Sequence, residues 1–218
     1  MQTAIITGAS EGLGLEFAKK FLNEGWNVVG ISRHRPEGIE MEYIEGDLSK
    51  EEDIVRITDE IKEKYSDFKV LINCAGLLNV EKLENIDYAK TESLFKVNVL
   101  APMMLVSKLK ENLLINNGTV VNIGSTISFK GIEEQAAYGA SKWALRGLSE
   151  NLKVELKGTG VRVISFNQGG TRTKIFEKAG MDLDTSKYLD PVELANLLFY
   201  VVSMPNNIEV SEIVVNRK

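Results

Sequence analysis

Short apolar runs alternate with longer amphipathic segments along the whole sequence, and this alternation strongly constrains the fold. The apolar runs have the length of buried strands. Strands are predicted over residues 4–6, 28–31, 41–44, 70–72, 119–123, 161–166 and 209–215. Strands that alternate with helices pair in parallel through right-handed crossovers. The sequence therefore predicts an α/β fold, a doubly wound parallel sheet of about seven strands with helices on both faces.

The segments between the predicted strands carry apolar residues at helical spacing. The first helix runs to about Asn23, and residues 49–52 (Ser-Lys-Glu-Glu) match a capping box that opens the second helix. Another helical region covers about 87–114 and is interrupted or kinked at Pro102, which cannot donate a backbone hydrogen bond. Further helices are predicted over residues 134–157 and after the start signal Asp190-Pro191.

Composition limits the class of protein. A chain of 218 residues with 44% hydrophobic residues can bury one core, so a single domain over 1–218 is expected. The net charge of −5 argues against nucleic-acid binding. Cys74 and His34 are the only residues of their types, which excludes an internal disulfide, a Cys or His metal cluster and a Ser-His-Asp triad. With no room for a signal peptide and no long apolar span, a cytoplasmic protein without a membrane partner is expected.

A glycine-rich turn follows the first predicted strand. Residues 7–14 read Thr-Gly-Ala-Ser-Glu-Gly-Leu-Gly, with glycines at positions 8, 12 and 14. Glycine lets the backbone approach a pyrophosphate closely, and the N-terminus of the next helix offers free N–H groups. An ordinary glycine-rich turn is the alternative, but its place between a first strand and a helix favours a dinucleotide site.

The end of the second predicted strand bears on the choice of dinucleotide. An acidic residue here is typical of NAD binding, whereas an Arg suits the 2′-phosphate of NADP. Ser32 is the last strand residue and Arg33 follows it, so NADP is predicted and NAD stays possible. Glu11 in the glycine turn argues against NADP because its charge lies near the adenosine end.

Tyr138 and Lys142 are four residues apart in the predicted helix over 134–157. Residues i and i+4 share one face of a helix, so the phenol and the ammonium would face a common space. A nearby cation lowers the pKa of a phenol, which would suit Tyr138 to acid/base work near neutral pH. The small and polar residues after the strands, in 73–76, 122–125 and 167–173, predict one continuous crevice around this pair.

Together these motifs resemble the short-chain dehydrogenase/reductase family, of the compact kind with a single Rossmann-like domain. The resemblance covers nearly the whole chain. It rests on the glycine turn of residues 7–14 and on Asp47-Leu48, Asn73-x-Ala75-Gly76, Asn98, Ser125 and Tyr138-x-x-x-Lys142, in the family's order and spacing.

The resemblance implies roles for these residues. Ser125 would hold the substrate oxygen, Tyr138 would be the acid/base, Lys142 would bind the nicotinamide ribose and tune the tyrosine, and Asn98 would hold a water in a proton relay. Asp47 would meet the adenine and Asn73 the adenosine-side ribose. The expected cofactor contacts are Thr7, Gly8, Ser10, Glu11, Gly12, Leu13, Gly14, Arg33, Asp47, Leu48, Asn73, Ala75, Gly76, Tyr138, Lys142, Gly169, Thr171 and Thr173.

Some stretches depart from the family pattern. Gln168 stands where the family usually has a proline, so a somewhat less rigid cofactor loop is expected. The segment over residues 171–189, which forms the substrate lid in the family, is short. Its Phe176, Met181 and Leu183 would line a pocket or serve as core contacts of a helix. The chain's last residues lack the Asp-Gly-Gly tail frequent in the family.

An oxidoreductase that interconverts a carbonyl and an alcohol with NADP is the function that this pattern favours. A non-catalytic NADP-binding regulator is the alternative, but such a protein would be free to lose Asn98, Ser125 or Tyr138. A sugar-nucleotide epimerase has a different glycine pattern and a larger C-terminal region. The substrate stays open among a 3-oxoacyl thioester, a steroid, a sugar and a 3-hydroxy acid.

The resemblance also implies a homodimer or homotetramer, with Val99, Met103, Val106, Trp143 and Leu152 as candidates to face a partner.

Overall fold

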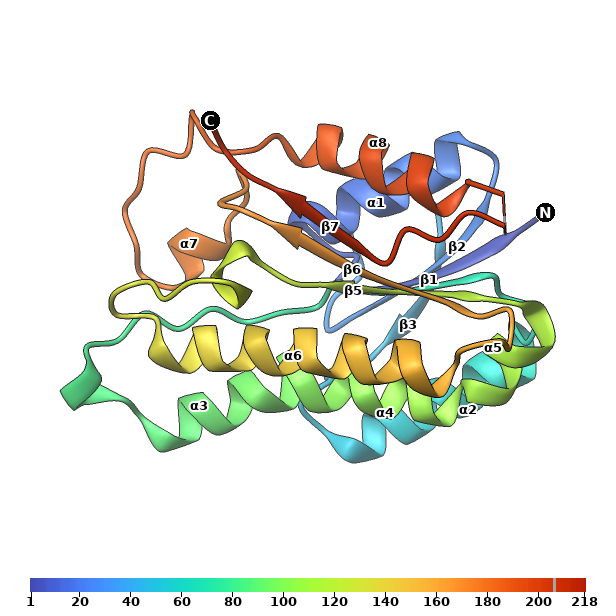
Figure 1. The fold of residues 1–218 in the computed structure, drawn as a ribbon, viewed down its shortest axis with the longest axis horizontal. Helices are drawn as coiled ribbons and strands as arrows, with labels where there is room; N and C mark the ends of the chain where they lie inside the picture. Colours follow the sequence, from blue (N-terminus) through green and yellow to red (C-terminus); the bar gives the residue numbers. More distant parts are fainter. Residues whose placement is uncertain (206) are drawn as a thin grey trace.

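A computed structural model describes residues 1–205 and 207–218 and contains a seven-stranded parallel sheet (Figure 1). The strand order is β3-β2-β1-β4-β5-β6-β7, so the chain builds outward from β1 in one direction and then crosses to the other side. The strands are β1 (Thr3–Thr7), β2 (Asn27–Ser32), β3 (Glu42–Glu45), β4 (Val70–Asn73), β5 (Thr119–Ile123), β6 (Arg162–Gln168) and β7 (Glu212–Val215). The predicted doubly wound sheet is confirmed, and its last strand begins later than expected.

Helices cover both faces of the sheet (Figure 1). On one face lie α1 (Gly12–Asn23) and α8 (Pro191–Val202), which pack against each other. The opposite face carries α2 (Glu51–Lys64), α4 (Ala101–Lys108), α5 (Lys110–Asn116) and α6 (Ala136–Glu155). Shorter elements are η1 (Leu83–Asn85), α3 (Tyr88–Phe95), the π-helical turn η2 (Lys96–Leu100), the 3₁₀ turn η3 (Thr126–Ser128) and α7 (Ile175–Lys178).

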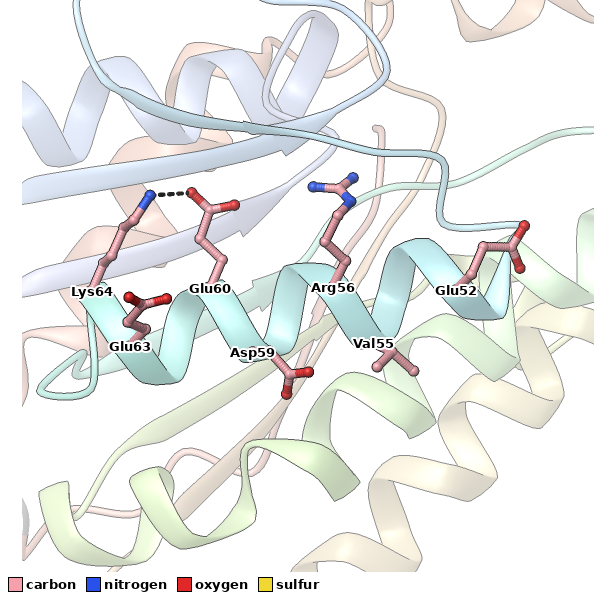
Figure 2. Close-up of a pocket in the computed structure, with 7 residues that line it drawn as sticks. All are labelled: Glu52, Val55, Arg56, Asp59, Glu60, Glu63 and Lys64. Carbon is pink, nitrogen blue, oxygen red and sulfur yellow. Dashed lines mark hydrogen bonds and ion pairs between the residues drawn. The ribbon is translucent and has the colours of Figure 1, made fainter.

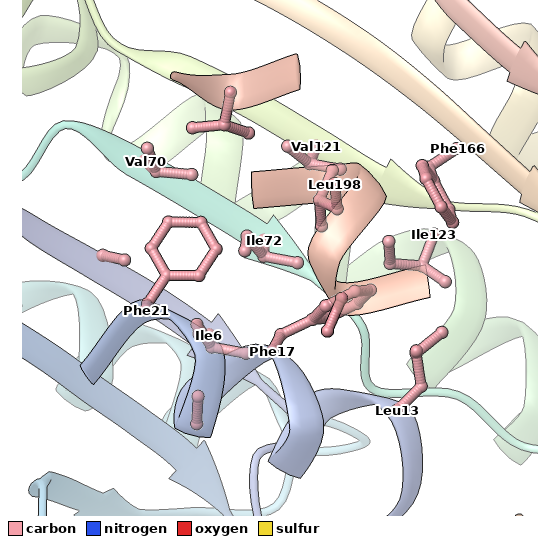
Figure 3. Close-up of a cluster of buried hydrophobic side chains, with 14 of the residues drawn as sticks. Ile6, Leu13, Phe17, Phe21, Val70, Ile72, Val121, Ile123, Phe166 and Leu198 are labelled. Carbon is pink, nitrogen blue, oxygen red and sulfur yellow. The ribbon is translucent and has the colours of Figure 1, made fainter. Parts of the chain in front are cut away.

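Alternating strand residues supply the two cores, as a period of two requires. Figure 3 shows the first core, where Phe17 and Phe21 of α1 and Leu198 of α8 meet Ile6 and Ile72 of the sheet. The neighbours of those strand residues point to the second core: Ile5 and Leu71 pack under α2 and α4. The register is set by this pattern, because a slip of one residue would exchange the two faces.

One local prediction is wrong, and the interruption expected near Pro102 is confirmed. The capping box at residues 49–52 does not form: Lys50 is the N-cap residue of α2, and the Ser49 hydroxyl instead donates to Asp47 at 2.8 Å. The helical region over 87–114 departs from α-helical geometry just before Pro102, in η2. There the N–H of Ala101 donates to the carbonyl of Lys96, five residues back, and Pro102 has no N–H for the carbonyl of Asn98.

Candidate active site

The direction of chain growth reverses between β1 and β4, and in open α/β sheets ligands bind at such a switch point. The Thr7 hydroxyl joins the two strands there, because its Oγ1 accepts hydrogen bonds of 3.0 Å from the backbone N–H groups of Cys74 and Ala75. A Cβ atom on Gly8 would lie 2.8 Å from the Cα of Ala75, so only glycine fits this crossing.

The glycine turn is built for close backbone approach. Gly8 and Gly12 have φ values of 70° and 55°, and a Cβ on Gly14 would lie 2.3 Å from the carbonyl oxygen of Gly8. Glu11 is the N-cap residue of α1, yet its side chain makes no capping bond, which leaves the first N–H groups of the helix without that partner. Ser10 is partly exposed and Leu13 is buried. This geometry fits the pyrophosphate site predicted from the sequence.

The predicted adenine end lies beyond β2 and β3. Arg33 is exposed directly after β2, whereas Leu48 is packed in the second core. Burial acts to raise the pKa of Asp47, but hydrogen bonds from Ser49 and the charge of Arg33 together hold it below its usual value. Asp47 is therefore a carboxylate at neutral pH, and Arg33 lies near enough to act on it.

Asn73 ends β4 in a buried polar chain. Its Nδ2 donates to Oδ1 of Asn122 at 2.8 Å, and Nδ2 of Asn122 donates to Ser149 of α6 at 2.9 Å. The Oδ1 atom of Asn73 has no hydrogen-bond partner in the described part of the chain. The amide group of Asn73 thus ties β4 to β5, and its contact with a ribose stays a prediction.

Asn98 lies in η2, and its side chain is 1% exposed. Its Oδ1 accepts from the N–H of Leu77 at 2.8 Å, and its Nδ2 donates to the Leu77 carbonyl at 2.9 Å and to Ser141 at 3.1 Å. A Cβ on Gly76 would lie 3.4 Å from this Oδ1 and 3.7 Å from Nζ of Lys142. The π-helical turn therefore brings Asn98 toward Lys142, as the predicted relay needs, while the relay itself stays a prediction.

Ser125, Tyr138 and Lys142 come together at the carboxyl ends of the strands. Tyr138 and Lys142 share one face of α6, with Nζ of Lys142 5.9 Å from the centre of the Tyr138 ring. Ser125 is the N-cap residue of η3 and accepts a hydrogen bond of 3.3 Å from the N–H of Ile127. Gly139 of α6 is close to Ile127, so the turn that carries Ser125 rests on the helix that carries Tyr138.

The pKa of Tyr138 differs from the prediction. Burial raises it to about 12, and a hydrogen bond with Ser125 opposes that shift only in part. The ammonium of Lys142 donates to the carbonyl oxygen of Ile123 at 2.9 Å instead of to the phenol. Lys142 is therefore not the dominant influence on the phenol in this structure, and the predicted lowering is wrong for it.

Lys142 is 6% exposed, and burial lowers its pKa to about 8. Cys74 was not among the predicted site residues, although its thiol lies close enough to interact electrostatically with Lys142. Burial raises the pKa of this thiol to about 12, with Lys142 opposing the shift. The position of Cys74 directly after β4 was the available signal, because chemistry is expected where these strands end.

The segment over residues 171–189 covers the glycine turn. Thr171 donates from Oγ1 to the carbonyl of Gly169 at 3.0 Å, and the Thr173 side chain lies against Gly12. Lys178 of α7 forms an ion pair with Glu11, a link that the sequence gives no signal for. A cavity of about 430 Å³ lies within this segment. Phe176, Met181 and Leu183 are among its lining residues, which supports the prediction that they line a pocket. The full lining is Arg172, Thr173, Lys174, Phe176, Glu177, Met181, Asp182, Leu183 and Thr185.

A second depression, along α2, lies apart from these groups (Figure 2). Its lining consists of side chains of that one helix, and Lys64 and Glu60 form an ion pair across it at 2.8 Å. Charged side chains on one helix face are a solvated surface, so this depression is not a candidate site.

Comparison with known proteins agrees with this architecture. A family model described as short chain dehydrogenase matches residues 2–184. The 3-oxoacyl-[acyl-carrier-protein] reductase of Buchnera aphidicola is 30% identical over 203 residues, covering 88% of this chain and 82% of the reductase. A short-chain dehydrogenase from Sphingobium yanoikuyae in complex with NADPH has a TM-score of 0.85 at 25% identity, covering 99% of this chain and 87% of that one. A 4-hydroxyisoleucine dehydrogenase complexed with NADH and succinate has a TM-score of 0.86 at 25% identity, with 98% and 97% covered.

The family match extends from β1 through the glycine turn, the Tyr138 helix and α7. Solved relatives with the same fold carry either NADPH or NADH. Among the described residues, no helix is both long and apolar enough to cross a membrane. The chain belongs to the short-chain dehydrogenase family and is an NAD(P)(H)-dependent oxidoreductase that interconverts a carbonyl and an alcohol.

Proposed function

We propose that Tyr138 is the acid/base of this reaction, with Ser125 binding the substrate oxygen and Lys142 and Asn98 supporting the proton path. The observation that carries the proposal is the meeting of these groups. Nζ of Lys142 is 5.9 Å from the Tyr138 ring, and Ser125 is close enough to influence the pKa of the phenol. The nicotinamide supplies or accepts the hydride, and the protein supplies orientation and the proton.

The protonation states suit reduction of a carbonyl. With a pKa raised to about 12, the Tyr138 hydroxyl keeps its proton at neutral pH and can donate it to the oxygen of the product alcohol. In oxidation the phenolate must form, and the positive charge of Lys142 would favour it. In this proposal the hydroxyl of Ser125, the N-cap residue of η3, donates to the same oxygen.

The glycine turn fits the pyrophosphate of a dinucleotide, because the close crossings at Gly8 and Gly14 leave backbone, not side chains, at that surface. We propose NADP as the preferred form, with Arg33 binding the 2′-phosphate and Asp47 and Leu48 near the adenine. Arg33 is exposed and forms no ion pair within 4.0 Å in the described part of the chain, although its charge acts on Asp47 from further away. Neutralisation of Glu11 by Lys178 also favours the extra phosphate.

The substrate is proposed to be a small carbonyl or alcohol compound that enters beside residues 171–189. The cavity there combines the apolar Phe176, Met181 and Leu183 with charged side chains of both signs, Arg172, Lys174, Glu177 and Asp182. Arg172 is also paired with Asp190. An apolar chain next to a carbonyl would match the apolar part of this lining. The names of the two relatives, a 3-oxoacyl reductase and a dehydrogenase of a hydroxy amino acid, support testing both compound classes.

A single-domain, cytoplasmic homodimer or homotetramer is proposed for the native form. Met103 and Trp143 support a partner contact because they are 40% and 50% exposed on α4 and α6. Val99 and Val106, by contrast, are buried within the chain, so they belong to the core and not to an interface. Sedimentation as a monomer at micromolar concentration would contradict the oligomer.

The reaction is tested by following reduced nicotinamide absorbance with NADPH and with NADH. The panel contains a 3-oxoacyl thioester, a 3-oxo ester, a steroid ketone, a keto sugar and, in the oxidative direction, hydroxy acids and hydroxy amino acids. Tyr138→Phe serves as the matched inactive control. Reduction of at least one carbonyl by the wild type, lost in Tyr138→Phe, is the expected result, whereas equal rates in both proteins would refute the assigned roles.

A further inference from the structure

Arg146 and Glu212 join α6 to β7 across a sequence separation of 66 residues. Nε of Arg146 donates to Oε1 of Glu212 at 2.9 Å, and Nη2 donates to Oε2 at 3.3 Å. Their side chains are 30% and 27% exposed, so this ion pair is less solvated than most on the surface. Two parallel bonds between a planar guanidinium and a carboxylate fix both distance and direction.

The same guanidinium holds the turn after β5. Its central carbon lies 4.3 Å from the centre of the Phe129 ring, a cation–π contact. Phe129 directly follows η3, the turn whose N-cap residue is Ser125. Ser128 of that turn also donates to the backbone carbonyl of Lys142 at 3.0 Å. Arg146 therefore helps to hold the Ser125 turn against the helix that carries Tyr138.

The Glu212 carboxylate reaches a third element through Asn167 of β6. Nδ2 of Asn167 donates to Oε1 of Glu212 at 3.4 Å and to the Ser165 hydroxyl at 3.0 Å. Asn167 is fully buried, and its Oδ1 has no hydrogen-bond partner in the described part of the chain. This oxygen faces Gly124, because a Cβ there would lie 2.0 Å from it. Gly124 immediately precedes Ser125, and Asn167 lies two residues before Gly169.

We propose that Arg146, Glu212 and Asn167 form a brace that positions Ser125 relative to Tyr138. They are positioning residues. Arg146 holds the C-terminal end of the Ser125 turn through Phe129, and Asn167 holds its N-terminal end through Gly124. The carboxylate of Glu212 connects the two. The proposal rests on the proposed role of Ser125, and it adds residues from the middle of α6, from β6 and from β7 to the support of the reaction.

A purely structural ion pair would predict different behaviour. Loss of such a pair lowers the melting temperature while the protein that remains folded turns over at the normal rate. Loss of a brace misplaces Ser125 in the folded protein, and a shift of about 1 Å can lower turnover on the order of a hundredfold. Cofactor affinity should change little in either case, since the glycine turn lies at another strand end.

The experiment compares Arg146→Met and Arg146→Lys with wild type, using the best carbonyl from the panel and NADPH. Lys64→Met is the matched control, because it removes a cation that is paired with Glu60 on α2. We expect kcat to fall roughly tenfold to a hundredfold in Arg146→Met. Arg146→Lys should be intermediate, since lysine restores the charge but not the fork or the stacking. The control should match wild type, and the Kd for NADPH should stay within about twofold in all variants.

Hydrogen exchange supplies a readout that needs no activity. Amides of residues 124–129 should exchange faster in Arg146→Met, whereas those of the glycine turn should not change. An unchanged kcat together with unchanged exchange at residues 124–129 would overturn the brace, whatever happens to the melting temperature. If Arg146→Met exchanges faster at residues 124–129 but the wild-type protein reduces none of the carbonyls, the brace is supported and the proposed function is refuted.

Discussion

The ammonium of Lys142 lies 2.9 Å from the carbonyl oxygen of Ile123, at the end of β5. This contact holds the lysine inside the fold, where burial lowers its pKa to about 8. Cys74 and Tyr138 share the region, and burial raises the pKa of each to about 12. Burial therefore favours the uncharged form of all three groups. The free energy of unfolding should depend on pH as these groups titrate.

The first prediction concerns stability between pH 8 and 9. Lysine in an unfolded chain has a pKa of about 10.4, so above pH 8 the unfolded state binds more protons at Lys142 than the folded state does. The free energy of unfolding must then rise with pH, by no more than about 1.4 kcal/mol per pH unit. Cys74 acts oppositely, because its unfolded thiol ionises first. The comparison is therefore made in a Cys74→Ser background.

Denaturant unfolding at pH 8.0, 8.5 and 9.0 checks this. Cys74→Ser should gain stability over the interval relative to Cys74→Ser/Lys142→Met, which lacks the titrating amine. Parallel curves for the two proteins would show that the pKa of Lys142 is not lowered.

The second prediction is the effect of Tyr138→Phe. The substitution removes one oxygen and keeps the ring, so unfolding free energy should change by about 1 kcal/mol or less. Turnover should fall at least about a hundredfold if the hydroxyl transfers the proton. Titration of NADPH should give nearly the wild-type Kd, since the glycine turn and Lys142 are intact. A variant that keeps most of its turnover would remove Tyr138 from the mechanism.

The sequence predicted those features of the site that depend on residues close together in the chain or on the order of the strands. Because the strands are parallel, residues at or just after the ends of different strands, such as Gly8, Asn73 and Ser125, had to meet at one edge of the sheet. The shared helix face of Tyr138 and Lys142 was also predictable, because the two residues are four positions apart in one helix. The pKa of the phenol was not predictable, since it depends on burial by distant segments.

Contacts between distant segments gave no sequence signal either. The Arg146–Glu212 fork and the Lys178–Glu11 pair each join surface-type residues that are ordinary on their own elements. The π-helical turn at Asn98 was only half anticipated, because Pro102 predicts an interruption but not its hydrogen-bond pattern. Ser49 failed as a cap because Asp47 competes for its hydroxyl.

The third prediction addresses the dinucleotide choice. Arg33→Ala should weaken NADPH binding on the order of tenfold to a hundredfold, the value of about 1.5–3 kcal/mol for a hydrogen bond to a charged group. NADH binding should change little, because NADH lacks the 2′-phosphate. Fluorescence titration of both cofactors with wild type and variant measures this. Equal losses for the two cofactors, or a wild type that prefers NADH, would contradict the role of Arg33.

The last prediction concerns the contact between Gly124 and Asn167. The backbone of Gly124 lies outside the left-handed region, so its φ alone does not demand glycine. A Cβ there, however, would lie 2.0 Å from Oδ1 of the fully buried Asn167. Gly124→Ala should therefore destabilise the protein by about 1–3 kcal/mol through overpacking. Gly147→Ala is the control, since a Cβ at that exposed site on α6 meets nothing within 4 Å and should be neutral or stabilising.

A double-mutant cycle separates this contact from general strain. Asn167→Ala removes the carboxamide that the new methyl group would strike, so Gly124→Ala should cost much less in that background than in wild type. The coupling should be about 1 kcal/mol or more, as is common for residues in direct contact. Equal costs in both backgrounds, measured by denaturant unfolding, would mean that Asn167 is not what excludes a side chain at position 124. The buried oxygen of Asn167 would then have no part in holding the backbone beside Ser125.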